Sequence, residues 1–79
     1  MKKNQLLLKK HIKLENKYIT NFKKNKSPID YAKGHKESEI IAIINGRNTK
    51  HKSLKSQKTK NYLTSVYNQA YKYGKKKYS

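Results

Sequence analysis

The sequence predicts one small all-α domain of three to four helices over residues 1–74, followed by a basic tail over residues 75–79. Apolar residues recur at helical spacing in two long segments, which is the main sequence signal of an amphipathic helix. Three glycines stand where such segments end, as glycines often do at helix C-termini. With 79 residues, of which 33% are hydrophobic, each helix can contribute only one face to a thin core.

The first helix is expected over about residues 3–24. At roughly 100° per residue its apolar side chains fall in one arc, and lysines occupy the other side. His11 and Glu15 lie within the arc one turn apart, where they can pair with each other or sit at its margin. The arc consists of Leu7, Leu8, Ile12, Leu14, Tyr18, Ile19 and Phe22, and the lysine side of Lys9, Lys10, Lys13, Lys17 and Lys24.

A second helix is expected over residues 28–33, because helix-start signals stand at its beginning. Ser27 is a suitable N-cap, Pro28 suits the first helical position, and Asp30 places an acid at the third. Gly34 can close a short turn after this helix.

A third helix is expected over residues 37–45. Glu37 and Glu39 precede the run Ile-Ile-Ala-Ile-Ile, and Gly46 follows it, which is the order of charges and glycine found in helices. A buried strand is the alternative, because periodicity cannot assign so short an apolar run.

The last helix is expected over residues 59–73, with Gly74 as its stop. Before it, residues 47–60 are polar and basic and have only Leu54 as an apolar anchor. This segment could be a loop, a weak helix or a segment ordered by its ligand. The apolar side of the last helix consists of Tyr62, Leu63, Val66, Tyr67, Ala70, Tyr71 and Tyr73.

The charge of the chain indicates a polyanionic partner. There are 21 Lys and Arg but four Asp and Glu, so the formal charge is +17 and most cations have no carboxylate to pair with. Solubility alone is usually reached with a net charge of about 2 to 8. Only Arg47 is an arginine, and lysine favours contacts through charge and shape over base reading. The abundance of Lys, Asn, Ile and Tyr also indicates an AT-rich genome, which explains the shortage of arginine equally well.

The predicted nucleic-acid-binding residues are the cations of the polar segment, their polar neighbours and the lysines of the tail. Lysines interspersed with Ser, Thr and Asn supply the charge and the hydrogen-bond donors that dominate contacts to phosphate oxygens. The set is Arg47, Asn48, Lys50, His51, Lys52, Lys55, Lys58, Lys60, Lys75, Lys76 and Lys77.

Part of this region resembles a helix-turn-helix motif. Ala42 and Gly46 have the spacing of the alanine and the turn glycine in that motif. The second helix of the common pattern has an apolar residue six positions after the glycine, where this chain has Lys52, with Leu54 two positions late. The resemblance implies that a second helix would present to the DNA groove Arg47, Asn48, Lys50, His51 and Lys55.

The seven tyrosines could fill a core or stack on unpaired bases. We expect Tyr62, Tyr67 and Tyr73 to be core residues, because they lie within the apolar arc. Tyr71, at the edge of the arc, and Tyr78, in the tail, are the candidates for stacking.

No motif indicates an enzyme, a cofactor or a metal site. The chain has no cysteine, no His-Glu-x-x-His and no glycine-rich phosphate loop. Asp30, Glu37 and Glu39 are the only carboxylates grouped closely enough in sequence to consider for a metal nuclease. The N-terminal apolar run is limited to Leu6–Leu8, which is too short for a signal peptide or a membrane span, so a cytoplasmic location is expected.

The sequence therefore predicts a small basic DNA-binding regulator or accessory factor of viral, plasmid or bacterial origin, which contacts mainly phosphates and has an undetermined oligomeric state. RNA or ribosome binding fits the same composition. A third hypothesis is an inhibitor that docks on an acidic surface of a protein partner. Docking of the first helix on anionic lipid is disfavoured, because its apolar face is needed for the core.

Overall fold

The computed structural model describes the backbone of residues 2–78 and the side chains of residues 4–78. It contains three helices, α1 (Lys2–Asn25), α2 (Pro28–Ile44) and α3 (Gln57–Tyr78), and no strand in the described part. The all-α prediction is confirmed. Residues 40–44, for which a strand was the alternative, are helical.

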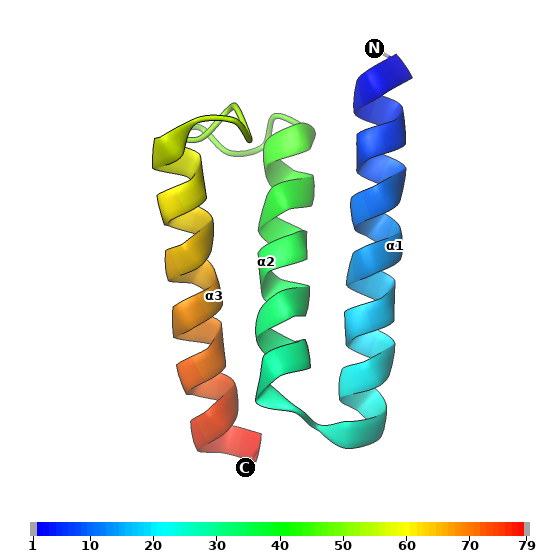
Figure 1. Ribbon diagram of the computed structural model, residues 1–79, viewed down its shortest axis with the longest axis vertical. Helices are drawn as coiled ribbons and strands as arrows, with labels where there is room; N and C mark the ends of the chain where they lie inside the picture. Colours follow the sequence, from blue (N-terminus) through cyan, green and yellow to red (C-terminus); the bar gives the residue numbers. More distant parts are fainter. Residues whose placement is uncertain (1, 79) are drawn as a thin grey trace.

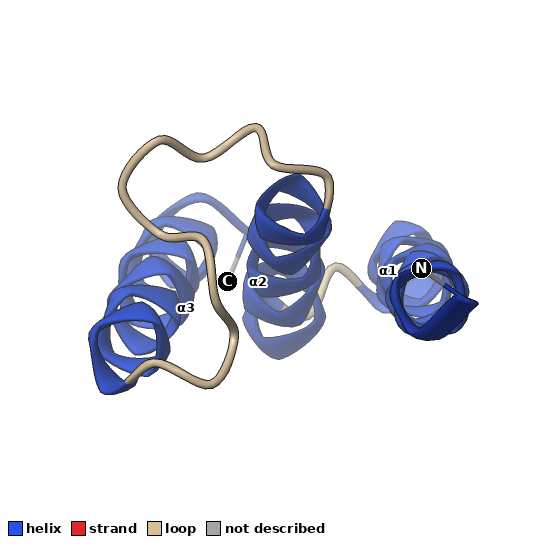
Figure 2. Cartoon of the chain, turned by 90° about the horizontal axis from the view of Figure 1, so that it is seen from above, coloured by secondary structure: helices blue, strands red, loops and turns tan. Residues whose placement is uncertain are grey.

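The three helices lie side by side in a single layer with α2 in the middle (Figures 1 and 2). Both α1 and α3 pack against α2, whereas no described Cα atom of α1 lies within 8 Å of one of α3. The layer measures 40 × 23 × 16 Å. Because α1 and α3 flank α2 without closing over it, the molecule has two broad faces.

Side-chain hydrogen bonds fix the connection between α1 and α2. The Ile29 backbone N–H donates to the Ser27 Oγ at 3.3 Å, so Ser27 is the predicted N-cap. The Ser27 N–H donates to the Asn25 Oδ1 at 2.8 Å, and the Asn25 Nδ2 donates to Asp30 at 3.1 Å. Asn25, and not Asp30 at the third helical position, therefore accepts the N-cap backbone N–H that the acid of a capping box would accept.

The predicted break at Gly34 is wrong, because residues 28–44 form one helix. Gly34 is buried within it, against Tyr18 and Ile19 of α1. Since α2 has neighbours on both sides, packing along its whole length outweighs the weak helix propensity of one glycine. The helix does end at Gly46, which has φ 73°. The Arg47 N–H donates to the Ala42 carbonyl and the Gly46 N–H to the Ile43 carbonyl, which is a Schellman motif.

The predicted stop at Gly74 is also wrong. Helix α3 continues to Tyr78, so the lysines at 75–77 form its last turn, and residue 79 of the predicted tail lies outside the described residues. Gly74 is buried against Pro28 and Tyr31. The Tyr78 ring packs against Phe22 at 4.9 Å between centroids, which anchors the end of the helix. Lysines in the last turn also interact favourably with the helix dipole.

The core lies mainly between α2 and α3. Ile40, Ile43 and Leu63 form its buried cluster, and Leu54 of the connecting segment covers one end. Between α1 and α2 the contact includes a polar pair, in which His11 Nδ1 lies 2.5 Å from Glu37 Oε2. His11 thus pairs across the helices rather than with Glu15.

Candidate nucleic-acid interface

The segment between α2 and α3 does not form the second helix of a helix-turn-helix motif. Residues 45–56 are a loop of turns and bends, and α3 begins only at Gln57. An apolar residue is missing where the second helix would need its anchor, and the loop instead crosses the ends of α2 and α3 (Figure 2). The five residues expected to face a DNA groove from that helix therefore lie on an irregular segment.

Two polar residues of the predicted binding set shape this loop. The Asn48 Oδ1 accepts hydrogen bonds from the backbone N–H groups of Lys50 at 2.9 Å and His51 at 2.8 Å. The His51 ring stacks on Tyr62 with centroids 4.3 Å apart and an interplanar angle of 16°. These contacts give Asn48 and His51 structural roles that their sequence context does not indicate.

The remaining predicted cations lie on different elements of the structure. Arg47, Lys50, Lys58 and Lys76 are exposed, the first two on the loop and the last two on α3. The Lys77 ammonium donates to the Tyr73 hydroxyl at 3.2 Å, and this hydrogen bond raises the pKa of Lys77.

Lys52 and Lys55 meet the ends of α1 and α2. They line a shallow pocket together with Leu7 of α1 and with Ile43 and Ile44 of α2. The predicted set is therefore spread over the loop and several sides of α3.

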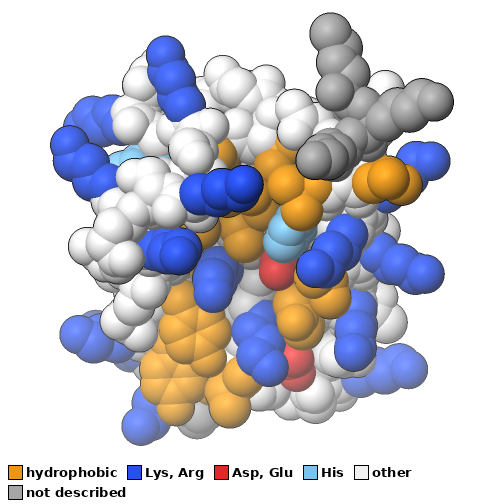
Figure 3. All heavy atoms as spheres, turned by 45° about the horizontal axis from the view of Figure 1, so that its top comes forward, with side chains coloured by type: hydrophobic (Ala, Val, Ile, Leu, Met, Phe, Trp, Pro, Cys, Tyr) orange, Lys and Arg blue, Asp and Glu red, His pale blue; other side chains and the backbone are white. Residues whose placement is uncertain are grey.

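One broad face of the layer gathers lysines from all three helices, and we call it the lysine face. At its centre is a groove that Tyr18, Lys33 and Tyr67 help to line, so α1, α2 and α3 all contribute. Helical periodicity places further lysines on the same side of α1 and α3. The lysines of this face are Lys10, Lys17, Lys33, Lys36, Lys60 and Lys75. Figure 3 shows basic side chains surrounding apolar and aromatic patches on one view of the surface.

Most lysines of the lysine face lie outside the predicted set, because that set follows a basic segment that is continuous in sequence. Only Lys60 and Lys75 belong to both sets. A periodic signal was available, since Lys60, Tyr67 and Lys75 recur at helical spacing on one stripe of α3. That α2 contributes two lysines to the same face follows only from how the helices are placed.

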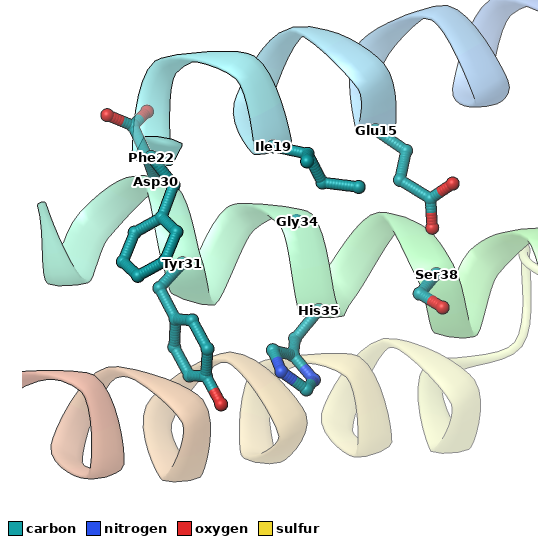
Figure 4. A pocket seen from close by; sticks show the side chains of 8 residues that line it. All are labelled: Glu15, Ile19, Phe22, Asp30, Tyr31, Gly34, His35 and Ser38. Atoms are coloured by element: carbon teal, nitrogen blue, oxygen red, sulfur yellow. The ribbon is translucent and has the colours of Figure 1, made fainter. Parts of the chain in front are cut away.

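The opposite face of the layer has a different character. Tyr31 and Lys33 are two residues apart, so they point to opposite sides of α2. Two pockets lie on the Tyr31 side, one against α1 (Figure 4) and one against α3, and their described linings contain no lysine or arginine. Glu15, Asp30 and Glu39 line them, which places three of the four acids of the chain on this face.

Two tyrosines on this opposite face have a raised pKa. The hydrogen bond that the Tyr62 hydroxyl donates to Glu39 raises the pKa of Tyr62, and burial adds to the rise. Burial, together with the hydroxyls of Tyr73 and Tyr78, raises the pKa of Tyr31.

The tyrosine predictions are only partly correct. Tyr73, expected in the core, is 50% exposed, because the flat layer has no further helix to cover it. Tyr62 and Tyr67 are half-buried. Tyr78, expected to be available for stacking, packs on the rings of Phe22 and Tyr31.

The carboxylates neutralise few of the lysines. Glu37 pairs with His11, Glu39 accepts from the Tyr62 hydroxyl, and Asp30 accepts from the Asn25 amide. Glu37 and Glu39 thus bind partners on different helices, and within residues 4–78 no group of three or more His, Asp or Glu side chains is arranged to hold a metal ion.

Among the described helices, none is both long and apolar enough to cross a membrane. No protein-family model, no curated protein and no solved structure matches this chain.

Proposed function

We propose that this chain is a small nucleic-acid-binding protein that contacts phosphates through its lysine face. The observation that carries the proposal is the distribution of charge over the flat layer. Lys33 and Lys36 line the groove of one face, and helical periodicity places four further lysines of α1 and α3 on the same side. Three of the four acids line pockets on the other face, and the fourth, Glu37, pairs with His11. A polyanion that approaches the lysine face meets ammonium groups without passing those carboxylates.

The geometry supports contacts with the phosphate backbone of the nucleic acid more than reading of its bases by a protein helix. The lysine face is broad and nearly flat, and lysine binds phosphate as a flexible point charge. Helix α2, which carries Lys33 and Lys36, is flanked on both sides by α1 and α3, so it cannot enter a major groove as a recognition helix does. Of the possible polyanions we favour DNA, in the context of a regulator or accessory factor of a virus, plasmid or bacterium.

A salt titration tests this proposal. Dissociation constants for a fluorescein-labelled DNA would be measured by anisotropy over a range of salt concentrations. For a duplex, log K should fall by about 0.9 per log unit of salt for each phosphate contacted. Binding that is absent at low salt, for DNA and RNA alike, would overturn the proposal and leave an acidic protein surface as the partner to examine.

Two triple variants that remove the same charge distinguish an effect of the lysine face on binding from an effect of net charge. The first is Lys17→Gln, Lys33→Gln and Lys36→Gln on the lysine face. The control is Lys9→Gln, Lys13→Gln and Lys23→Gln, three exposed positions on other sides of α1. The first variant should reduce the magnitude of the slope of log K against log salt concentration by up to about 2.7, which is three times the value for one phosphate. The control should reduce it by much less. Equal losses would show attraction by net charge alone and would contradict the role of this face.

A further inference from the structure

The groove at the centre of the lysine face has the composition of a nucleotide site, with aromatic walls and cationic groups together. It measures about 320 Å³, within the usual range for small-ligand pockets. It crosses the middle helix, with one wall from α1 and the other from α3. The lining residues are Tyr18, Lys33, Lys36, Glu37, Thr64 and Tyr67.

The cationic side of the groove comes from α2. Lys33 and Lys36 are three residues apart, so their side chains are neighbours on the helix surface. The Lys33 ammonium lies 5.5 Å from the centre of the Tyr18 ring, which holds it above that wall. Glu37 is the only carboxylate among the described lining residues, and it is engaged with His11 on the α1 side. A phosphate group in the groove would therefore meet two ammonium groups.

The aromatic side comes from α3. Tyr67 lines the groove, and Tyr71 follows one turn later on the same stripe. The two rings are nearly parallel, with an interplanar angle of 11° and centroids 6.4 Å apart. Flat rings beside cations suit unpaired bases, because every base has a π-face and stacks with little regard to sequence. Thr64 donates its hydroxyl to the Lys60 carbonyl, which leaves its oxygen lone pairs to accept from a base.

We infer that this groove binds one nucleotide of a single strand, with the base against Tyr67 and the phosphate at Lys33 and Lys36. The inference rests on the proposed function and specifies its substrate class. A duplex keeps its bases stacked on one another, so it could use the lysines of the face but not the aromatic wall. Single-stranded nucleic acid is then the preferred ligand.

The test compares one oligonucleotide as a single strand and as a duplex at the same salt concentration. The single strand would be a labelled oligothymidine of about 20 nucleotides, longer than the ~4–16 nucleotides that small single-strand-binding folds occupy. The duplex would be the same strand annealed to oligoadenine. The single strand is expected to bind more tightly.

A set of tyrosine variants assigns that preference to the groove. Tyr67→Leu should weaken single-strand binding about tenfold, a typical loss for one stacked base, and leave duplex binding within about twofold. Tyr67→Phe keeps the ring and should bind as the unchanged protein does. Tyr73→Leu is the matched control, since Tyr73 is an exposed tyrosine of the same helix on the opposite face.

A second measurement uses the unchanged protein and needs no variant. Stacking of a base on Tyr67 should shift the ring proton resonances of Tyr67 upfield when oligothymidine is added, with smaller changes at Tyr73. Equal affinities for both forms, with no effect of Tyr67→Leu, would overturn the inference and leave phosphate binding intact. So would an unshifted Tyr67 resonance at saturation. If neither form bound, the proposed function itself would fail.

Discussion

Two buried glycines have different surroundings, although both lie inside helices. A Cβ atom at Gly34 would lie 3.8 Å from the Tyr18 Cβ and 3.9 Å from the Ile19 Cγ1, which are ordinary van der Waals distances. A Cβ atom at Gly74 would lie 3.0 Å from the Tyr31 Cδ2 and 3.4 Å from the Pro28 Cα. Space is therefore available at the first glycine and not at the second.

This difference predicts opposite outcomes for the same substitution. Gly34→Ala should stabilise the protein by about 0.5–1 kcal/mol, because alanine loses less backbone entropy in a helix. For a domain of this size the rise in Tm should be about 4–8 °C per kcal/mol. Gly74→Ala should give no gain, because the Tyr31 ring would have to move from its contacts with other rings. Thermal unfolding followed by circular dichroism checks both, and equal gains would contradict the packing around Gly74.

Other single residues act through specific partners. His11 and Glu37 form a largely buried pair between α1 and α2, with side chains 14% and 11% exposed. Glu39 accepts a hydrogen bond from the Tyr62 hydroxyl, and the His51 ring of the loop stacks on the Tyr62 ring. Two acids in the same helix therefore connect it to different neighbours.

At the scale of elements, the loop over residues 45–56 is held by few contacts. Leu54 packs against the core cluster, and Asn48 organises the first half through two backbone N–H groups. The loop carries five cations that repel one another: Arg47, Lys50, Lys52, Lys55 and, when protonated, His51.

Asn48→Ala should loosen the first half of this loop without unfolding the helices. The backbone N–H groups of Lys50 and His51 would lose their acceptor, and stability should fall by about 1 kcal/mol. Hydrogen exchange measured by NMR should show faster exchange at these two amides. Asn68→Ala, at an exposed position of α3, is the control and should leave both amides unchanged. Unaltered protection at residues 50 and 51 in Asn48→Ala would show that other contacts define the loop.

The lengths of α2 and α3 were underestimated for one physical reason. The glycines at 34 and 74 have low helix propensity, and sequence patterns count that against a continuous helix. In the structure both glycines lie where two elements meet, so packing on each side of the glycine keeps the helix continuous. Gly46 has open space around it and a φ of 73°, and there the helix does end.

For the whole molecule, the single layer makes α2 the element on which the other two depend. Ile43 belongs to the cluster with Leu63 of α3. Ile41 follows Gly34 by seven residues and therefore faces α1. These two buried isoleucines thus belong to separate interfaces of the same helix.

Truncating each isoleucine by one methyl group should loosen different helices. Ile41→Val and Ile43→Val should each cost about 0.5–1.5 kcal/mol, which leaves the protein folded. Amide exchange should rise mainly in α1 for Ile41→Val and mainly in α3 for Ile43→Val, because α1 and α3 share no backbone contact. Identical exchange profiles for the two variants would show that the layer opens only as a unit.

The arrangement in one layer also explains how much of the candidate site the sequence could indicate. The excess of lysine over carboxylate is visible in the composition and predicts a polyanion as partner. The segment from Arg47 to Lys60 is predicted to bind nucleic acid because its cations are close together in sequence. The groove joins Tyr18, Lys33 and Tyr67, which are distant in sequence, and no local pattern connects them.

The sequence by itself determined the helical class, the N-cap at Ser27, the end of α2 at Gly46 and the charge of the surface. Each of these depends on neighbouring residues or on composition, so local physical chemistry is sufficient. The tertiary structure alone decided that two helices continue through their glycines, that the segment after Gly46 is a loop, and that three of the four acids line pockets on the face opposite Lys33 and Lys36. Those features depend on contacts between residues far apart in the chain, where packing energy outweighs local preference.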